Sequence, residues 1–298
     1  MDFRFSIVIP LYNRANYISK AIKSVLNQSY QDFELIIVDD ASSDESLQIV
    51  KAINDKRLRV VSLSENGGNA KARNAGWRVA KGEWIVYLDS DDWFEPNYLQ
   101  NLSETIRANS DISFFWTGVR YVNPTGGIIK EEFWSPQSAL PSTTFFDELR
   151  IGTNCGVAFK KRMLESFNGF DELFKASVDR EFFLRISQKE KGAGISKILV
   201  NCLIGDHESV RKDFLAQYDA YSRLIDRYHK LIELNNSRKK WWYHKAMWLA
   251  LYCGKTNQAR IYLKSMGYPI KSSLLYLIFV LFPFSFAKKM HKRIAKSL

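Results

Sequence analysis

The sequence is poor in cysteine, and its cysteines form no metal-binding or disulfide pattern. Cys155, Cys202 and Cys253 are the three cysteines among the 298 residues, and no two of them make a C-x-x-C pair. We therefore expect neither a zinc site nor a disulfide framework. Free thiols are typical of a reducing compartment, and Met1 leads almost directly into an expected strand instead of a basic, apolar leader. The resulting expectation is a cytoplasmic protein without a signal peptide.

Other absences exclude whole classes of protein. No G-x-G-x-x-G motif occurs, which argues against a dinucleotide-dependent dehydrogenase. No internal repeat or long low-complexity segment is present, and an apolar share of 46% excludes a disordered chain. The most apolar run, Leu274–Ala287, contains Pro283. As a helix it would reach about 21 Å, which is short of the ~30 Å hydrocarbon core of a bilayer.

Acidic residues are scarce in the last third of the chain. Through Val210 there are 25 Lys and Arg against 28 Asp and Glu, whereas from Arg211 onward there are 18 against 4. The net charges are therefore −3 and +14, and the second favours an anionic partner, either nucleic acid or membrane. Basic residues directly follow the apolar run, namely Lys288, Lys289, Lys292, Arg293 and Lys296.

An apolar run followed by a basic one is typical of a segment that lies in an anionic membrane interface. The alternative is a helix that packs on the rest of the protein and carries a solvated basic end. A nucleic-acid reader would not need the apolar run, so we expect no nucleic-acid partner.

Strands and helices are expected to alternate four times in the first 110 residues. The strands are expected near Phe5–Pro10, Leu35–Asp40, Arg59–Leu63 and Ile85–Leu88. Of the four expected helices, the first is capped by Asn13 and the second by Ser42 or Ser43. The third begins at Gly67–Gly68 and the fourth at Pro96. This alternation predicts a parallel α/β sheet, in which ligands bind beyond the carboxyl ends of the strands. Pro10, Asp39 and Asp89 all lie at those ends.

Later segments are less regular. Strands are expected over Ile112–Val122 and near Ile128–Trp134, Asn154–Phe159, Ile198–Val200 and Leu203–Ile204, with a loop over Ser135–Thr144, a helix over Asp179–Gln188 and helices from Asp213 onward.

An acidic cluster follows the strand in WIVYLDSDDW. Asp89, Asp91 and Asp92 cannot all ionise at close range unless a cation lies among them. An Asp-x-Asp pair offers hard oxygen ligands, which suit Mn²⁺ or Mg²⁺ shared with substrate phosphates. The alternative is a solvated acidic loop.

Five segments in register carry a family resemblance. They are IVIPLYNR, IIVDDASSDES, GGNAKARNAG, YLDSDDWFEP and GFDELF…VDREFFLRI, spread over roughly residues 5–205. Together they resemble the family 2 glycosyltransferases. The resemblance implies a GT-A fold with a mostly parallel, Rossmann-like sheet, a nucleotide-diphosphate sugar donor, a divalent cation and an inverting single displacement.

The resemblance also implies residues that bind the donor. It places Pro10 and Tyr12 against the base and ribose, and Asp39 on uracil, where a carboxylate can accept from an imino N–H. Alternatively, Asp39 caps the following helix. Arg73 is implied to face the diphosphate, for which a guanidinium is well suited. The alternative is a solvated pair of Lys71 and Arg73 on a helix face.

The metal ligands follow from the same resemblance. Asp89 would meet the ribose or the metal and Asp91 the metal itself, whereas Asp92 is expected to cap the next turn. His207, in GDHESV, resembles a histidine that ligates metal or donates to phosphate. A lone histidine in a loop often does neither.

Asp179 is implied to be the general base that takes the proton of the acceptor hydroxyl. The family usually has Glu-Asp here, and this chain has Val178-Asp179. The change removes a neighbouring carboxylate, with consequences for acceptor contacts or pKa tuning. Glu181 is a competing candidate, and Asp171 is expected to hold the GFDE turn.

We therefore expect a GT-A catalytic domain over residues 1–210 and a helical region over 211–298, with a membrane-binding tail at about 272–298. The expected protein is an inverting, metal-dependent hexosyl- or N-acetylhexosaminyltransferase, peripheral on the inner face of the cell membrane. It would use a UDP-sugar and a lipid-linked or cell-surface glycan acceptor. One alternative is a sugar-nucleotide nucleotidyltransferase, which would need a Gly-rich basic loop after the first strand. A non-catalytic nucleotide-binding relative is the other.

Overall fold

The computed structural model describes residues 4–133, 155–205, 213–282, 284–285 and 287–289. The loop expected over Ser135–Thr144 lies outside these residues. The chain divides into two compact units. The first contains the described part of Met1–Leu173 and Val178–His207, and the second contains the described part of Phe174–Ser177 and Glu208–Leu298.

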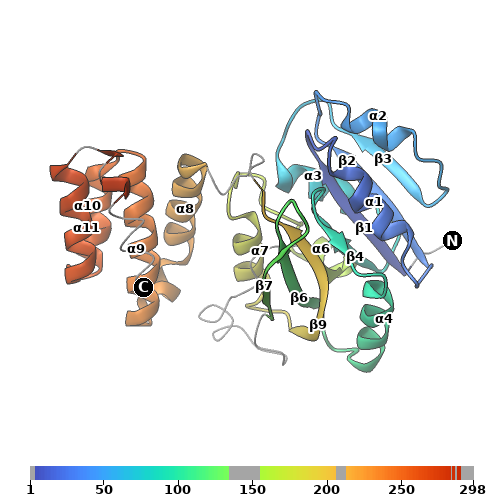
Figure 1. Ribbon diagram of the computed structural model, residues 1–298. Helices are drawn as coiled ribbons and strands as arrows, with labels where there is room; N and C mark the ends of the chain where they lie inside the picture. Colours follow the sequence, from blue (N-terminus) through green and yellow to red (C-terminus); the bar gives the residue numbers. More distant parts are fainter. Residues whose placement is uncertain (1–3, 134–154, 206–212, 283, 286, 290–298) are drawn as a thin grey trace. The chain divides into compact units, whose positions relative to one another are not determined.

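Among the described residues, the first unit contains a nine-stranded sheet (Figure 1). The strand order is β3 (Leu58–Ser62), β2 (Phe33–Asp39), β1 (Phe5–Leu11), β4 (Trp84–Tyr87), β8 (Val157–Lys160), β6 (Phe114–Val122), β9 (Gly192–Leu203) and β5 (Trp93–Phe94), with β7 (Ile128–Glu132) paired to β6. Strands β3, β2, β1 and β4 are parallel, which confirms the predicted parallel half. Strand β8 runs antiparallel to β4 and begins the mixed half.

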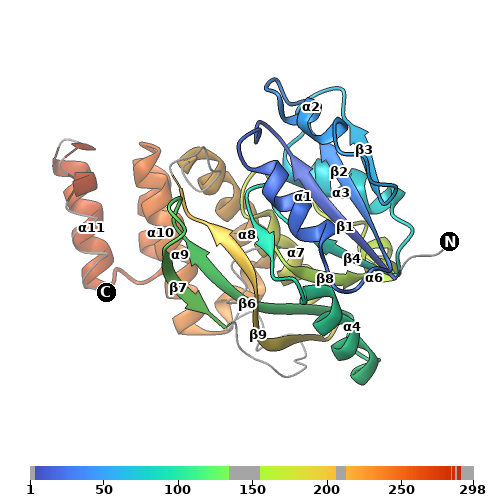
Figure 2. The ribbon, with the colours of Figure 1, turned by 45° about the vertical axis from the view of Figure 1, so that its right-hand side comes forward.

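Apolar sequence runs explain the parallel half. Every residue of β1, β2 and β4 is buried, as expected for strands covered on both faces. The helices of this unit are α1 (Ile18–Leu26), α2 (Ser46–Lys51), α3 (Asn69–Val79), α4 (Tyr98–Ala108), α6 (Lys161–Ser166) and α7 (Val178–Ile186). Helix α3 packs on β1 and β2 (Figure 2). A Cβ at Gly76 of α3 would lie 2.3 Å from Val8 Cγ1, so a glycine permits this close packing.

Some local expectations are wrong. Asn13 does not cap α1, which begins five residues later and has no side-chain cap. Asn13 instead has a φ of 49° and accepts a hydrogen bond from the Ser43 N–H. Asp44, rather than Ser42 or Ser43, accepts from the backbone at the start of α2, through Ser46 N–H.

Two further differences concern the mixed half of the sheet. The two short strands expected near Ile198–Val200 and Leu203–Ile204 belong to one twelve-residue strand, β9, apart from Ile204. Helix α6 was not expected, because six residues are too few to show a helical period.

The described part of the second unit is helical. It contains α8 (Phe214–Glu233), α9 (Asn236–Tyr252), α10 (Thr256–Ser265) and α11 (Ile270–Leu281). Asp213 and Asn235 cap α8 and α9 by accepting from backbone N–H groups. Helix α11 packs on α9 and α10. No helix in the described part of the chain combines the length and apolar character needed to cross a membrane.

Candidate active site

The carboxyl ends of β1 and β2 lie side by side, and three predicted donor-binding residues lie at or next to them. Pro10 is buried within β1, opposite Val38 of β2. Tyr12 directly follows β1, and its side chain is 42% exposed. Asp39, the last residue of β2, is buried and accepts a hydrogen bond from the Ser42 N–H at 3.2 Å. The carboxylate of Asp39 therefore shapes the turn before α2 and lies at the carboxyl edge of the parallel strands.

Arg73 of α3 joins two acidic residues that are distant in the sequence. Its Nη2 donates to Asp89 Oδ1 at 2.9 Å, and its Nη1 donates to Asp179 Oδ1 at 2.8 Å. Arg73 is 2% exposed, which excludes the alternative of a solvated Lys71/Arg73 pair. Burial alone would lower the pKa of Arg73, but the charges of Asp179 and Asp89 raise this pKa above its usual value. The guanidinium is thus a fixed cation between the two carboxylates.

Asp91 also faces a cation. Its Oδ2 lies 3.5 Å from Nε of Arg14, which comes from the segment after β1. The backbone N–H of Arg14 donates to Ser46 Oγ, so the segment is tied to the start of α2. Sequence reasoning missed Arg14, because nothing in the sequence relates it to an acid 77 residues away.

We expected Asp92 to cap the next turn, but its carboxylate binds elsewhere. Its Oδ1 accepts from the backbone N–H of Leu203 at 2.9 Å and so ties the acidic segment to the end of β9. Burial, reinforced by the charges of Asp91 and Asp89, raises the pKa of Asp92 well above its usual range.

Asp179 and Glu181 lie in the first turn of α7 but have different surroundings. Asp179 is about one quarter exposed and meets Arg73, as described above. Glu181 is fully buried, and its two oxygens accept from Nε and Nη2 of Arg185 at 2.9 and 3.0 Å. Val178, where the family usually has Glu, is buried. The geometry favours Asp179 over Glu181 as the group that can reach a ligand.

A second residue of α3 that sequence reasoning missed is Asn74. Its amide contacts both N–H and C=O of Phe170, and it donates to Glu172 Oε1 at 2.7 Å. The GFDE turn is thereby fastened to α3. Asp171 accepts from the Leu173 N–H within the turn, as expected.

Asp40, also missed, fixes the start of α3. Its two oxygens accept from the N–H groups of Gly67 and Gly68 at 2.8 and 2.7 Å. Gly68 has a φ of 84°, which a residue with a Cβ rarely adopts. The Gly-Gly pair was the available signal, but its partner could not be identified without the fold.

Carboxylates are the donors that a hard divalent cation prefers, so Asp89 and Asp91 fit the predicted metal by chemistry. Each carboxylate already lies near an arginine, so part of its charge is compensated by the protein itself. His207 lies outside the described residues. The described residues therefore offer Asp89 and Asp91 as candidate ligands.

A parallel sheet with acidic residues at its carboxyl edge, continued by a mixed half, is typical of a GT-A-type fold. The family model described as "Glycosyl transferase family 2" matches residues 6–167. The chain belongs to this family.

Curated relatives are similar over part of their length. The chain is 33% identical over 213 residues to a hyaluronan synthase from Pasteurella multocida, which covers 70% of this chain and 21% of that protein. It is 30% identical over 253 residues to a chondroitin synthase from Escherichia coli, which covers 80% of this chain and 36% of that protein. The chain thus spans about a fifth to a third of the length of these relatives.

Solved structures share the fold. TarS 1–349 from S. aureus, in complex with UDP-GlcNAc, has a TM-score of 0.64 at 18% identity and covers 93% of this chain and 86% of that one. The mannosyltransferase PcManGT from Pyrobaculum calidifontis, in complex with GDP-Man and Mn²⁺, has a TM-score of 0.56 at 18% identity. The shared fold covers 100% of this chain and 81% of that one.

Proposed function

We propose that this chain is an inverting glycosyltransferase that moves a sugar from a UDP-sugar to a hydroxyl group of a glycan acceptor. The observation that carries the proposal is the buried Arg73, which holds Asp89 and Asp179 together at the carboxyl edge of the sheet. A donor-binding carboxylate and a base are the two groups that a single displacement needs in one place.

The donor would lie across the ends of β1, β2 and β4. Tyr12 offers an exposed aromatic face for the base, and Asp39 offers a carboxylate at the adjacent strand end. The complexes of TarS with UDP and UDP-GlcNAc support a uridine nucleotide. The UDP-GlcNAc complex supports an N-acetylhexosamine or related hexose as the transferred group.

Asp89 and Asp91 would hold Mn²⁺ or Mg²⁺. When bound, the cation would offset negative charge on the departing nucleoside diphosphate. Arg73 and Arg14 add fixed positive charge at the same edge, so the chain itself contributes to holding the diphosphate. The Mn²⁺ complex of PcManGT supports a metal-dependent site of this kind.

Asp179 would take the acceptor proton. Arg73 fixes the direction of one carboxylate oxygen, and about a quarter of the side chain stays accessible. Attack by the deprotonating hydroxyl on the face of the anomeric carbon opposite the leaving group would invert its configuration. Glu181 is a poor base, because it is buried and paired with Arg185.

The acceptor and the location are part of the proposal. The names of the two synthases support a glycan acceptor, and we propose that this glycan is lipid-linked or on the cell surface. Helix α11 carries a stripe of exposed apolar residues at helical spacing, Ile270, Leu274, Leu277 and Leu281, which are 87%, 54%, 48% and 69% exposed. With the +14 charge of the last third, this stripe supports peripheral binding to an anionic membrane, on the cytoplasmic face.

A donor screen tests the proposed reaction. Purified chain with Mn²⁺ is incubated with UDP-GlcNAc, UDP-GalNAc, UDP-glucose, UDP-glucuronate or GDP-mannose, and nucleotide release is measured with and without glycan acceptors. We expect UDP release from at least one UDP-sugar, and an anomeric configuration in the product opposite to that of the donor. Pyrophosphate-forming activity with UTP and a sugar 1-phosphate would indicate the nucleotidyltransferase instead. UDP binding without turnover of any donor would indicate a non-catalytic relative.

A further inference from the structure

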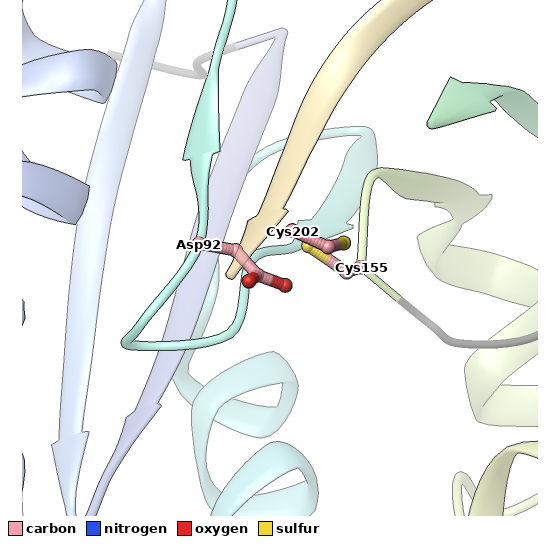
Figure 3. Close-up of side chains that lie close together, drawn as sticks. All are labelled: Asp92, Cys155 and Cys202. Atoms are coloured by element: carbon pink, nitrogen blue, oxygen red, sulfur yellow. The ribbon is translucent and has the colours of Figure 1, made fainter. Parts of the chain in front are cut away.

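Two cysteines that are 47 residues apart in the sequence meet beside the acidic motif. Asp92 follows β4, Cys155 precedes β8, and Cys202 lies near the end of β9 (Figure 3). One ligand atom from each, a carboxylate oxygen and two sulfurs, lies within 4.8 Å of both others, and all three residues are buried. The expectation that the cysteines form no metal-binding group rested on their spacing, which does not show that three strand ends converge.

The three side chains are mutual neighbours, with one ligand atom of each within 4.8 Å of the other two. Asp92 in addition accepts the Leu203 N–H, and a carboxylate has the capacity to accept this bond and bind a cation. The cluster is therefore a closed triangle of potential ligands, held by a backbone anchor.

We propose that Asp92, Cys155 and Cys202 form a binding site for a thiophilic divalent cation, Zn²⁺ or its analogue Cd²⁺. Two sulfurs and one carboxylate oxygen are a ligand set that soft or borderline cations prefer, whereas Mn²⁺ and Mg²⁺ prefer oxygen alone. The site is thus chemically distinct from the carboxylate pair Asp89/Asp91. It goes beyond the proposed transferase function and does not depend on it.

The separations of the ligand atoms allow tetrahedral coordination after a small contraction. Two sulfurs that each lie about 2.3 Å from a tetrahedral Zn²⁺ are roughly 3.8 Å apart. A cluster whose ligand atoms lie within 4.8 Å of one another needs to contract by roughly 1 Å at most to reach that separation. Three protein ligands leave a fourth position, which a water molecule can fill.

Binding would join three segments of the sheet. The loop after β4, the start of β8 and the end of β9 would be cross-linked next to Asp89 and Asp91. Because the cation binds the folded chain, it should raise the thermal midpoint by mass action. Each removed ligand should weaken binding, with the thiolates contributing more than the carboxylate to a soft cation.

The test is a Cd²⁺ titration of the full chain, reduced with a phosphine and kept in excess Mg²⁺ so that oxygen-only sites are occupied. Thiolate-to-cadmium charge-transfer absorption in the ultraviolet reports sulfur ligation. We expect one Cd²⁺ per chain, and a loss of affinity of at least about tenfold in Cys155→Ser and in Cys202→Ser. Cys253→Ser, which lies in the second unit, is the matched control and should bind as the wild type does.

A second measurement needs no variant. X-ray absorption at the zinc edge, on wild-type chain loaded with one Zn²⁺, should show two sulfur neighbours and the remainder oxygen. A first shell of oxygen or nitrogen alone would overturn the proposal. So would wild-type chain that gives no charge-transfer band, or a band that disappears in Cys253→Ser and persists in the Cys155→Ser/Cys202→Ser double variant.

Discussion

At the scale of single residues, the candidate site depends on Arg73. A guanidinium can donate in two directions at once, and here Nη1 and Nη2 reach different carboxylates. A lysine would keep the charge, but its three N–H donors all lie on one nitrogen and cannot reproduce the planar fork. The side chain of Arg73 is 3% exposed, whereas those of Asp89 and Asp179 are 29% and 26% exposed, so the arginine depends on these two carboxylates for its compensation.

We predict that Arg73→Met destabilises the fold by about 3 kcal/mol, because it leaves two partly buried carboxylates without their cation. Transfer activity should fall as well, and Arg73→Lys should restore stability more than activity. Arg78→Met is the matched control on the same helix. The side chain of Arg78 is 48% exposed, and its nearest approach to Glu172, from Nη1 to Oε1, is a long 3.6 Å. This variant should change stability by less than about 0.5 kcal/mol. Urea unfolding and donor turnover are the measurements, and equal effects of the two variants would contradict the role of Arg73.

The carboxylate pair yields a second prediction at this scale. If Asp89 and Asp91 hold a hard cation, Asp91→Asn should lower donor turnover by orders of magnitude, and EDTA should inactivate the wild type. Adding Mn²⁺ or Mg²⁺ should restore wild-type activity, because these ions prefer oxygen ligands. Full turnover by metal-free wild-type chain would show that the reaction needs no cation. Asp92→Asn is the comparison within the motif and should have the smaller effect, because Asp92 faces Leu203 and the two cysteines.

The limits of prediction from the sequence are clearest for single residues. The motif residues could be found because each stands beside a recognisable strand end or helix start. Their partners could not: Arg14 meets Asp91, Asp40 holds Gly67 and Gly68, and Asn74 holds the GFDE turn through contacts between distant positions. The same limitation hid the group formed by Asp92, Cys155 and Cys202.

At the scale of elements, apolar runs predicted the parallel half of the sheet well. β1, β2 and β4 are buried on both faces, and this produces an unbroken apolar signal. The mixed half was harder, because β9 is long and its burial is irregular. A single strand therefore reads as two short ones. Helix starts also depend on backbone geometry that spacing does not show, as the positive φ of Asn13 illustrates.

Helix α11 has two different faces. Ser272, Leu275 and Ile278 are buried, and Ser272 Oγ contacts His244 Nδ1 of α9 at 2.9 Å. The exposed stripe, of which Leu274 and Leu281 are members, lies elsewhere on the helix. One face of α11 packs on the helical unit and another stays accessible, so the packing of this helix does not exclude membrane binding.

This division allows a sharper test of membrane binding than removal of the tail. We predict that the triple variant Leu274→Glu/Leu277→Glu/Leu281→Glu binds liposomes with anionic lipid more weakly, since it removes apolar contact and adds repulsion. Leu234→Glu is the control, because Leu234 is 76% exposed and lies after α8. High salt should weaken wild-type binding only in part, because apolar contact is not screened. Equal flotation of wild type and triple variant would show that α11 is not the contact.

At the scale of the whole molecule, the chain combines a GT-A-type sheet with a helical unit whose exposed stripe and basic charge differ from the acidic site region. The family assignment rests on residues 6–167, whereas Asp179 lies beyond that match. The proposal that Asp179 is the base therefore depends on the geometry of this chain, through the contact between Asp179 and Arg73.

The most direct test of the account compares wild type, Asp179→Asn and Glu181→Gln with the donor identified by the screen. For each protein, the rise in thermal midpoint caused by UDP with Mn²⁺ is measured alongside sugar transfer. The rise is compared within each protein, because both substitutions also disturb an ion pair. Asp179→Asn should keep the UDP-dependent rise and lose transfer by roughly 10²–10⁴-fold, the usual contribution of a general base. Glu181→Gln should lower the midpoint while folded protein still transfers sugar. Wild-type transfer rates in Asp179→Asn, together with loss of transfer in folded Glu181→Gln, would contradict the account.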